Sequence, residues 1–266
     1  MHHQQKSLFK EIKMPQLSIM LPAFKEEHVD YLNLTLDSLR NQYFTDFEVL
    51  IPHNHSKDPD TTGLNAKVMR PDPRLSVNEW YNIISKEAEG DLIMTTSDDL
   101  IFSRQSLHNM VSLCNSYGGI IHPISQNDVG LLYLAQFSVV NEELKRLNLK
   151  RYMRIDEVKG FVDSIKNFDT KFSTPFLFPV KWVCTFATMM RKSTWDLLKG
   201  FDTDTYKIGQ IDVDFCLRAA KEKIMTYVTP NAFVFHFGGV STDGNIPSEV
   251  KVRDMQAFKN RWDFVP

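Results

Sequence analysis

Two adjacent carboxylates, Asp98 and Asp99, follow the apolar residues 92–94 after three short polar residues. An uninterrupted apolar run is typical of a strand that is buried on both faces, so we expect the pair at the tip of a strand. In open α/β sheets the carboxyl ends of the strands hold the ligands, and carboxylate oxygens suit Mg²⁺ or Mn²⁺ bound together with phosphates. The pair alone is also compatible with a turn that caps the next helix.

A second pair of carboxylates, Asp212 and Asp214, opens a predicted helix in the last quarter of the chain. Side chains two positions apart on a helix point in different directions, so at most one of the two addresses any given site. His236 ends a later predicted strand, just before two glycines. A single histidine in such a place is more often structural than functional.

His53 and His55 lie in a polar loop after the second predicted strand. Their spacing is compatible with metal ligands. A loop with alternating exposed side chains has the same spacing, and no cysteine or third histidine follows closely. The ordinary loop is therefore the favoured interpretation.

These residues are positioned by a predicted alternation of strands and helices. A strand at residues 17–21, an amphipathic helix and a strand at residues 47–51 form a βαβ unit, which places its strands parallel. A helix at residues 76–89 leads into the strand that ends at Asp98. More helices are expected after residue 103, within 141–168 and around 195, the last one after an aromatic-rich apolar stretch at 178–190, and more strands near 120, at 228 and at 232–235. The helix positions predicted to be buried are Val29, Leu32, Leu36, Leu39, Tyr43, Trp80, Ile83, Ile84, Ala88, Leu107, Met110, Val111 and Cys114.

Composition narrows the function classes. The 266 residues, 42% of them hydrophobic, suffice for one large α/β domain or two small ones. A net charge of -2 does not suggest the excess of basic residues that nucleic-acid-binding proteins have. The lack of a G-x-G-x-x-G motif after a strand disfavours a dehydrogenase. Three well-separated cysteines favour a reducing compartment, and no apolar run is long enough to span a bilayer. We therefore expect a cytoplasmic protein.

Five cations lie within ten residues of the predicted helical region at 141–168. A solvated helix face is the default interpretation of such a cluster. A peripheral contact with anionic lipid headgroups is the alternative. The cluster consists of Lys145, Arg146, Lys150, Arg151 and Arg154.

Five short motifs occur in an order that resembles the family 2 glycosyltransferases, and the resemblance covers most of the chain. They are LSIMLPAFKEE, TSDD, KSTWDLLKGFDTD, IDVDFCLRA and VFHFGG. The resemblance implies a GT-A fold, a Rossmann-like α/β domain with a mixed, mostly parallel sheet flanked by helices. It implies a single domain at residues 15–266 after an N-terminal tail at 1–14. Residues 15–125 would form the nucleotide-binding half and residues 126–266 the acceptor half.

The matched motifs also imply roles for individual side chains. Asp212 takes the position of the catalytic base, and a helix N-terminus favours the ionised carboxylate that a base needs. Phe24 takes the position of the aromatic ring that packs on the donor base. The implied metal ligands are Asp98, Asp99 and His236. The implied donor contacts are Pro22, Phe24, Glu26, His53, Asn54, Ser56, Asp58, Asn82, Ser97 and Asp98.

Candidate contacts on the acceptor side lie in and just before the helix of the base. Trp182 and Phe186 have flat faces that suit a pyranose ring, although packing in the core explains both equally well. Asp214 is the third candidate for a contact with a sugar or acceptor.

The sequence departs from the family pattern at several acidic positions. Thr96 stands where the metal signature has its first Asp, which weakens the expected metal site. His53 and Asn54 replace the acidic pair that reads the donor base, and Ile211 replaces a Glu before the base. These departures are compatible with an uncommon donor. They are also compatible with a loss of activity.

The resemblance thus implies a metal-dependent, inverting glycosyltransferase of glycan biosynthesis that uses Mn²⁺ or Mg²⁺. Its partners would be a UDP, GDP or dTDP sugar and a glycan or lipid-linked acceptor. The alternative is a catalytically silent domain of the same fold that binds a sugar nucleotide or a glycan. A nucleotidyltransferase is disfavoured, since PAFKEE is neither the glycine-rich nor the basic phosphate loop that such enzymes use.

Overall fold

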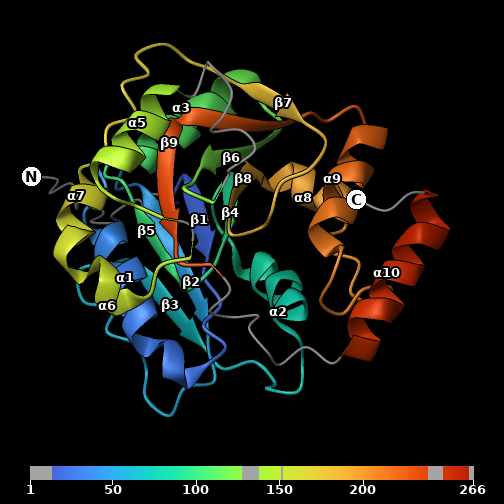
Figure 1. Cartoon of the computed structure of the whole chain (residues 1–266). Coiled ribbons are helices and arrows are strands. Elements are labelled where there is room, and N and C mark those ends of the chain that lie inside the picture. The colour runs from blue at the N-terminus through green and yellow to red at the C-terminus, as the bar shows by residue number, and fades with distance from the viewer. Residues whose placement is uncertain (1–13, 128–137, 151, 239–247, 264–266) are drawn as a thin grey trace, which may run out of the picture.

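The computed structural model describes residues 14–127, 138–150, 152–238 and 248–263. Its strands form one sheet in the order β3-β2-β1-β4-β8-β6-β9-β5, and β7 pairs with β9 beside this path (Figure 1). The strands are β1 (Leu17–Met20), β2 (Phe47–Pro52), β3 (Ala66–Met69), β4 (Leu92–Thr96), β5 (Leu100–Phe102), β6 (Ile120–Ile124), β7 (Phe178–Val180), β8 (Ala187–Arg191) and β9 (Thr226–His236).

Strand direction divides the sheet into two parts. β1 is parallel to β2 and β4, and β2 is parallel to β3. In the other part, β8 is antiparallel to β4 and β6, and β9 is antiparallel to β5 and β7 but parallel to β6. The predicted α/β fold with a mixed sheet is confirmed. Because β1, β2 and β4 run parallel, the loops after them meet at one edge of the sheet.

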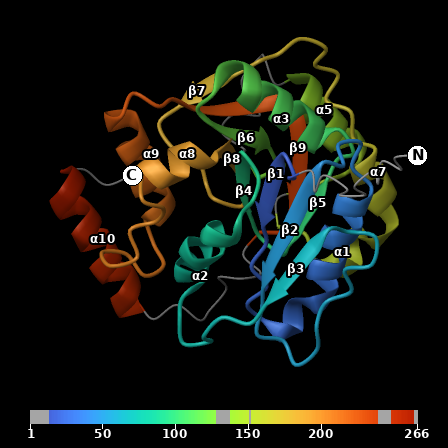
Figure 2. The same ribbon diagram turned by 180° about the vertical axis from the view of Figure 1, so that it is seen from behind.

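Helices surround the sheet, as the two opposite views show (Figures 1 and 2). In Figure 1, α1 lies on the left of the sheet and α9 on the right, with α10 outside α9. The helices are η1 (Glu26–His28), α1 (Val29–Arg40), α2 (Val77–Ile84), η2 (Ser85–Glu87), α3 (Ser106–Tyr117), α5 (Ser138–Arg146), α6 (Ile155–Val158), η4 (Lys159–Phe161), α7 (Val162–Lys166), α8 (Lys192–Leu197), α9 (Ile211–Lys221) and α10 (Ser248–Trp262).

Alternate residues of the central strands supply two hydrophobic cores. Leu92 and Met94 of β4 belong to the core that contains the buried leucines of α1 and the apolar side of α3. Ile93 belongs to the other core, together with buried residues of α2, α8 and α9. Both faces of β4 are therefore covered, which explains why its residues 92–94 are all apolar.

Several predicted helix positions are wrong in detail. Val29, Tyr43 and Ile83 were expected to be buried, but 41%, 70% and 39% of their surfaces are exposed. Tyr81 is buried in place of Ile83. The two strands expected near residues 228 and 232–235 are one long strand, β9.

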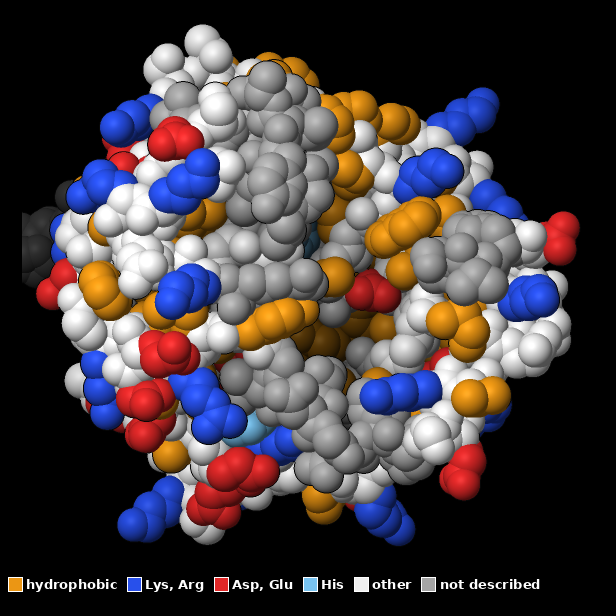
Figure 3. Space-filling model, viewed as in Figure 1, with side chains coloured by type: hydrophobic (Ala, Val, Ile, Leu, Met, Phe, Trp, Pro, Cys, Tyr) orange, Lys and Arg blue, Asp and Glu red, His pale blue; other side chains and the backbone are white. Residues whose placement is uncertain are grey.

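The expected cation cluster is partly neutralised within α5. Lys145 bonds to Glu142 at 3.1 Å, and Arg146 forms a two-pronged pair with Glu143. Arg151 lies outside the described residues. Basic and acidic side chains are interspersed on the left of the molecule in Figure 3. Within the described ranges, no helix is long and apolar enough to cross a membrane.

Candidate active site

The candidate site begins at the carboxyl end of β4, where Asp98 and Asp99 follow the last strand residues. Both side chains are buried. The hydroxyl of Thr35, on α1, donates to the carbonyl oxygens of Asp98 at 3.0 Å and of Leu100 at 2.9 Å, and accepts from the amide of Leu100 at 2.9 Å. Tyr81, on α2, donates to the carbonyl of Thr96 at 2.5 Å. Two helices thus fix the backbone that carries the carboxylates.

Asp99 faces His236 across the site. The Asp99 Oδ2 atom lies 3.4 Å from His236 Nε2, and Ser97 Oγ donates to the other carboxylate oxygen at 2.6 Å. The pairing of β5 with β9 sets Leu100 opposite His236, and Phe237 N donates to the carbonyl of Asp99 at 3.1 Å. Burial alone would raise the pKa of Asp99, but the nearby His236 and the bond from Ser97 hold this pKa below its usual value.

An acid and an imidazole that face one another are a suitable start for a metal site. A cation of the Mg²⁺ type uses one or two carboxylates and takes its remaining ligands from phosphates and water. In the part of the chain that the structure describes, no three His, Cys, Asp or Glu residues converge as a complete cage. The carboxylate that His236 faces is that of Asp99, so Asp99 joins Asp98 as a principal candidate ligand.

Aromatic rings extend the site beyond His236. The ring of Phe186 stacks on His236 with centroids 4.2 Å apart, and the ring of His122 meets Phe186 edge-on at 4.5 Å. Phe186 lies just before β8, His236 ends β9, and His122 lies in β6. His122 was missed by the sequence reasoning because it lies inside an apolar strand, where a buried histidine carries no local signal.

Phe186 and Trp182 line a cavity of about 280 Å³, together with His122, Val180, Val183, Cys184 and Val228. The thiol of Cys216 on α9 bonds to the backbone of Val183. Residues 182–186 therefore connect α9, which they contact at Val183, with the His236 ring, on which Phe186 stacks. Figure 3 shows a hollow near the middle of this face, with hydrophobic side chains at its floor and an acidic side chain at its rim.

The donor-side residues lie at the ends of β1 and β2. Phe24 is half-buried and packs on the fully buried ring of Trp80 at a centroid distance of 5.1 Å. Pro22 is buried at the end of β1. Ser56 on the neighbouring loop bonds to the carboxylate of Glu26 through both its amide and its hydroxyl. The hydrogen bonds between Ser56 and Glu26 thus join the loops after β1 and β2, and Trp80 packs against the Phe24 ring.

The loop at residues 53–58 is held together by contacts of a buried histidine. The His53 ring is fully buried and its Nε2 atom lies 3.1 Å from the exposed Asp58 carboxylate, which also accepts from Arg70 at 2.7 Å. Burial and the nearby Arg70 lower the pKa of His53. His53 is therefore a support of this loop rather than an exposed donor contact, whereas Asn54 is exposed.

The two carboxylates of α9 have separate environments. Asp212 is half-buried in the first turn, where burial raises the pKa of its carboxyl and its Oδ1 accepts from Val213 N at 2.9 Å. Asp214 has no exposed surface, and its two oxygens accept from Arg218 Nε at 2.7 Å and Trp262 Nε1 at 3.0 Å. Asp214 is thus not available to a sugar, which corrects its expected place among the acceptor contacts.

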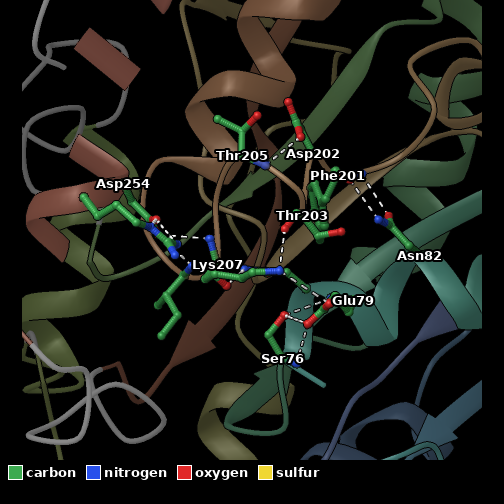
Figure 4. A network of polar contacts seen from close by, with 12 residues as sticks. Ser76, Glu79, Asn82, Phe201, Asp202, Thr203, Thr205, Lys207 and Asp254 are labelled. Carbon is green, nitrogen blue, oxygen red and sulfur yellow. Dashed lines mark hydrogen bonds and ion pairs between the residues drawn. The ribbon is translucent and has the colours of Figure 1, made fainter. Parts of the chain in front are cut away.

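Asn82 also differs from its expected role as a donor contact. Its side chain donates to the carbonyl of Phe201 at 2.8 Å and accepts from the amide of Phe201 at 2.9 Å. Gly200 makes this approach possible, because a Cβ atom there would lie 2.4 Å from Asn82 Oδ1. Asn82 therefore binds α2 to the backbone segment after α8, as Figure 4 shows.

A family comparison covers more than half of the chain. Residues 18–197 match the model of the family described as Glycosyl transferase family 2. These residues include Asp98 and Asp99, whereas Asp212 and His236 lie after them. A comparison with curated proteins found no match.

Several solved structures are similar to this chain in fold. The mannosyltransferase PcManGT from Pyrobaculum calidifontis, in complex with GDP-Man and Mn²⁺, is 16% identical with a TM-score of 0.60, and the match covers 96% of this chain and 67% of that one. S. aureus TarS 1–349 in complex with UDP-GlcNAc is 15% identical with a TM-score of 0.56, covering 92% and 67%. GalNAc-T7 with UDP, GalNAc and Mn²⁺ is 9% identical with a TM-score of 0.56, covering 85% of this chain and 44% of that one.

Proposed function

Because the chain belongs to glycosyl transferase family 2, we propose that it transfers a sugar from a nucleotide-sugar donor to a hydroxyl of a glycan or lipid-linked acceptor, with inversion at the anomeric carbon. The observation that supports this reaction best is the facing pair of Asp99 and His236 at the carboxyl end of β4. Sugar-nucleotide complexes of PcManGT and TarS support a donor of the same class.

The donor would lie across the loops after β1, β2 and β4. Phe24 is positioned to take the base on its exposed face, since Trp80 covers the other side. Asp98, Asp99 and His236 would hold a divalent cation, Mn²⁺ or Mg²⁺. Such a cation neutralises the charge that develops on the diphosphate leaving group when it is bound. The Mn²⁺ in the PcManGT and GalNAc-T7 complexes supports this choice of ion.

Asp212 would act as the general base. In the transfer, the bond between the anomeric carbon and the diphosphate oxygen breaks, and a bond to the acceptor oxygen forms on the opposite face. The acceptor proton passes to the Asp212 carboxylate. Because burial raises the pKa of this carboxyl, its ionised form is a stronger base than an ordinary aspartate.

The test is an incubation of the protein with Mn²⁺ and a panel of UDP, GDP and dTDP sugars, with glycan and lipid-linked acceptors. The account expects one donor to release its nucleoside diphosphate together with a glycosylated product. A panel that yields neither product, while a nucleoside diphosphate still binds, would contradict it.

That last outcome would favour the second candidate, a silent domain that binds a sugar nucleotide or a glycan. Thr96 in place of an acidic residue and the buried ring of His53 are the observations on its side. Binding without turnover of every donor in the panel is the result that this second candidate requires.

A further inference from the structure

Asp254, on α10, binds the backbone that leads into the base helix. Its Oδ2 atom accepts hydrogen bonds from the amides of Lys207, Ile208 and Gly209, at 3.1, 2.9 and 3.0 Å (Figure 4). Arg253 donates to the other oxygen at 2.6 Å. Asp254 has no exposed surface, and although burial alone would raise its pKa, these hydrogen bonds hold the pKa below its usual value. The side chain is therefore a buried carboxylate that uses one oxygen for three successive amides of one loop and the other for Arg253.

This loop decides where α9 begins, because α9 has no cap of its own. Gln210, at the N-terminal boundary, has the left-handed φ of +62° and no side chain makes a cap hydrogen bond. A helix without a side-chain cap takes its starting position from the backbone before it. That backbone is residues 207–209, and Asp212 lies in the first turn after it.

The opposite side of the same segment is held by α2. Asn78 donates to the carbonyl of Lys207 at 3.0 Å, and the Lys207 ammonium lies 3.6 Å from Glu79 and donates to the carbonyl of Thr203 at 2.9 Å. Figure 4 shows the loop between these α2 side chains and Asp254. The segment at residues 207–209 is therefore bound from two sides. α2, which belongs to the core, binds its inner side, and α10, which lies outside α9, binds its outer side.

α10 also contacts α9 directly, through Trp262 at the C-terminal end of α10. Trp262 donates to Asp214 in the first turn of α9, and the Lys221 ammonium in its last turn lies 4.2 Å from the Trp262 ring centroid. Arg261 pairs with Asp202, in the segment after α8. The middle of α10, at Asp254, and its C-terminal end, at Arg261 and Trp262, thus contact α9 or the segments that lead into it.

We propose that Asp254 is a positioning residue for the general base: it holds residues 207–209, and through them the first turn of α9, so that Asp212 stands where the acceptor hydroxyl is deprotonated. Asp254 itself touches no substrate. The inference rests on the proposed function of Asp212, and two measurements separate the failure of one from the failure of the other.

The first measurement is amide hydrogen exchange, which needs no activity. Asp254→Ala is compared with Gln256→Ala, a matched control on the same helix whose side chain is exposed and donates to Asn260 on that helix. The amides of residues 207–209 and 213–214 should exchange about tenfold faster or more in Asp254→Ala, as expected when a hydrogen bond to a charged group is lost. They should be unchanged in Gln256→Ala. Unchanged exchange in a folded Asp254→Ala protein would overturn the proposal.

The second measurement is a double-mutant cycle in the transfer reaction. Asp254→Ala should lower kcat by about tenfold and leave the donor KM within about twofold, because only the transition-state contact of the base is disturbed. In the Asp212→Asn background the same substitution should cause no further loss. Equal losses in both backgrounds would show a merely structural role and overturn the proposal. An Asp212→Asn protein with full turnover would instead contradict the base assignment.

Asp254→Asn keeps the cycle decisive if Asp254→Ala does not fold. The amide keeps the shape and one acceptor oxygen but loses the charge. A smaller loss of kcat, again confined to the background that retains Asp212, is the expected result, and an equal loss in both backgrounds contradicts the proposal here too.

Discussion

Asp212 and Asp214 lie two positions apart on α9, but their carboxylates have different environments and different roles. Burial opposes the charge of Asp212, whose carboxylate accepts from the amide of Val213, whereas Arg218 and Trp262 bind the charge of Asp214. The sequence predicted that the two carboxylates point in different directions. It did not reveal which one is buried, since Trp262 is 48 residues further along the chain.

Stability separates the two carboxylates without an assay of function. Asp214→Asn should lower the free energy of unfolding by about 3 kcal/mol, because it leaves the half-covered Arg218 without its charged partner. Asp212→Asn should leave this free energy unchanged or raise it at pH 7, since the raised pKa means that the ionised form is disfavoured in the folded state. Urea unfolding of both variants at pH 7 tests this, and a larger loss for Asp212→Asn would contradict the roles assigned here.

Phe24 offers a second test at the residue scale. Stacking of a base on an aromatic ring is worth about 1–3 kcal/mol, so Phe24→Ala should weaken nucleotide binding about fivefold or more. The melting temperature should change little, because the ring is only half-buried. Calorimetric titration with UDP, GDP and dTDP gives the affinity. A large loss of stability with unchanged affinity would make Phe24 a core residue instead.

His236 is the third residue whose role can be isolated. The account expects nucleoside diphosphates to bind more weakly in excess EDTA than in Mn²⁺, because the diphosphate charge otherwise meets Asp98 and Asp99 unscreened. His236→Ala should reduce the affinity for Mn²⁺ by about tenfold or more, the loss that even outer partners of metal ligands cause. Titration of both proteins with Mn²⁺ measures it. Equal nucleotide binding of the wild-type protein in Mn²⁺ and in EDTA would remove the metal assignment.

At the scale of elements, long periodic segments were predictable and short or weakly patterned ones were not. The strands β1, β2 and β4 and the helices α1, α2, α3 and α9 were expected near their observed positions. β5 was missed because three residues carry little pattern, and β3 was missed because none of its four residues is fully buried, so it lacks the apolar run of β1. α10 was missed because only Asp254 and Phe258 are buried among its described side chains, which leaves almost no apolar stripe.

The contact between α2 and the segment after α8 makes a prediction about Gly200. Its φ of +65° and the nearby Asn82 Oδ1 both oppose a side chain. Gly200→Ala should lower the free energy of unfolding by more than the 1–2 kcal/mol or so that the left-handed backbone costs on its own. Gly63→Ala is the matched control, since Gly63 has a φ of +78° but nothing within 4 Å of the added atom. Equal losses in thermal unfolding would show that the Asn82 contact adds nothing.

At the scale of the whole molecule, the sheet assembles the candidate site from distant parts of the chain. The parallel order of β1, β2 and β4 gathers the loops with Phe24, His53 and Asp99, and this followed from the βαβ pattern. The approach of His236 to Asp99 did not follow, since it depends on the pairing of β9 with the unpredicted β5. Only the resemblance to family 2 glycosyltransferases joined these two residues at the sequence level.

The central claim is that Asp212 deprotonates the acceptor while the residues after β4 bind the donor diphosphate. The most direct test measures turnover and nucleotide affinity of the wild type, Asp99→Asn and Asp212→Asn in one series, with the donor that the wild type accepts. The account predicts that Asp212→Asn loses about 10²–10⁴ in turnover and keeps its affinity, as for loss of a general base, whereas Asp99→Asn loses both. Turnover of Asp212→Asn above about a tenth of the wild-type value, well outside the general-base range, would contradict the account.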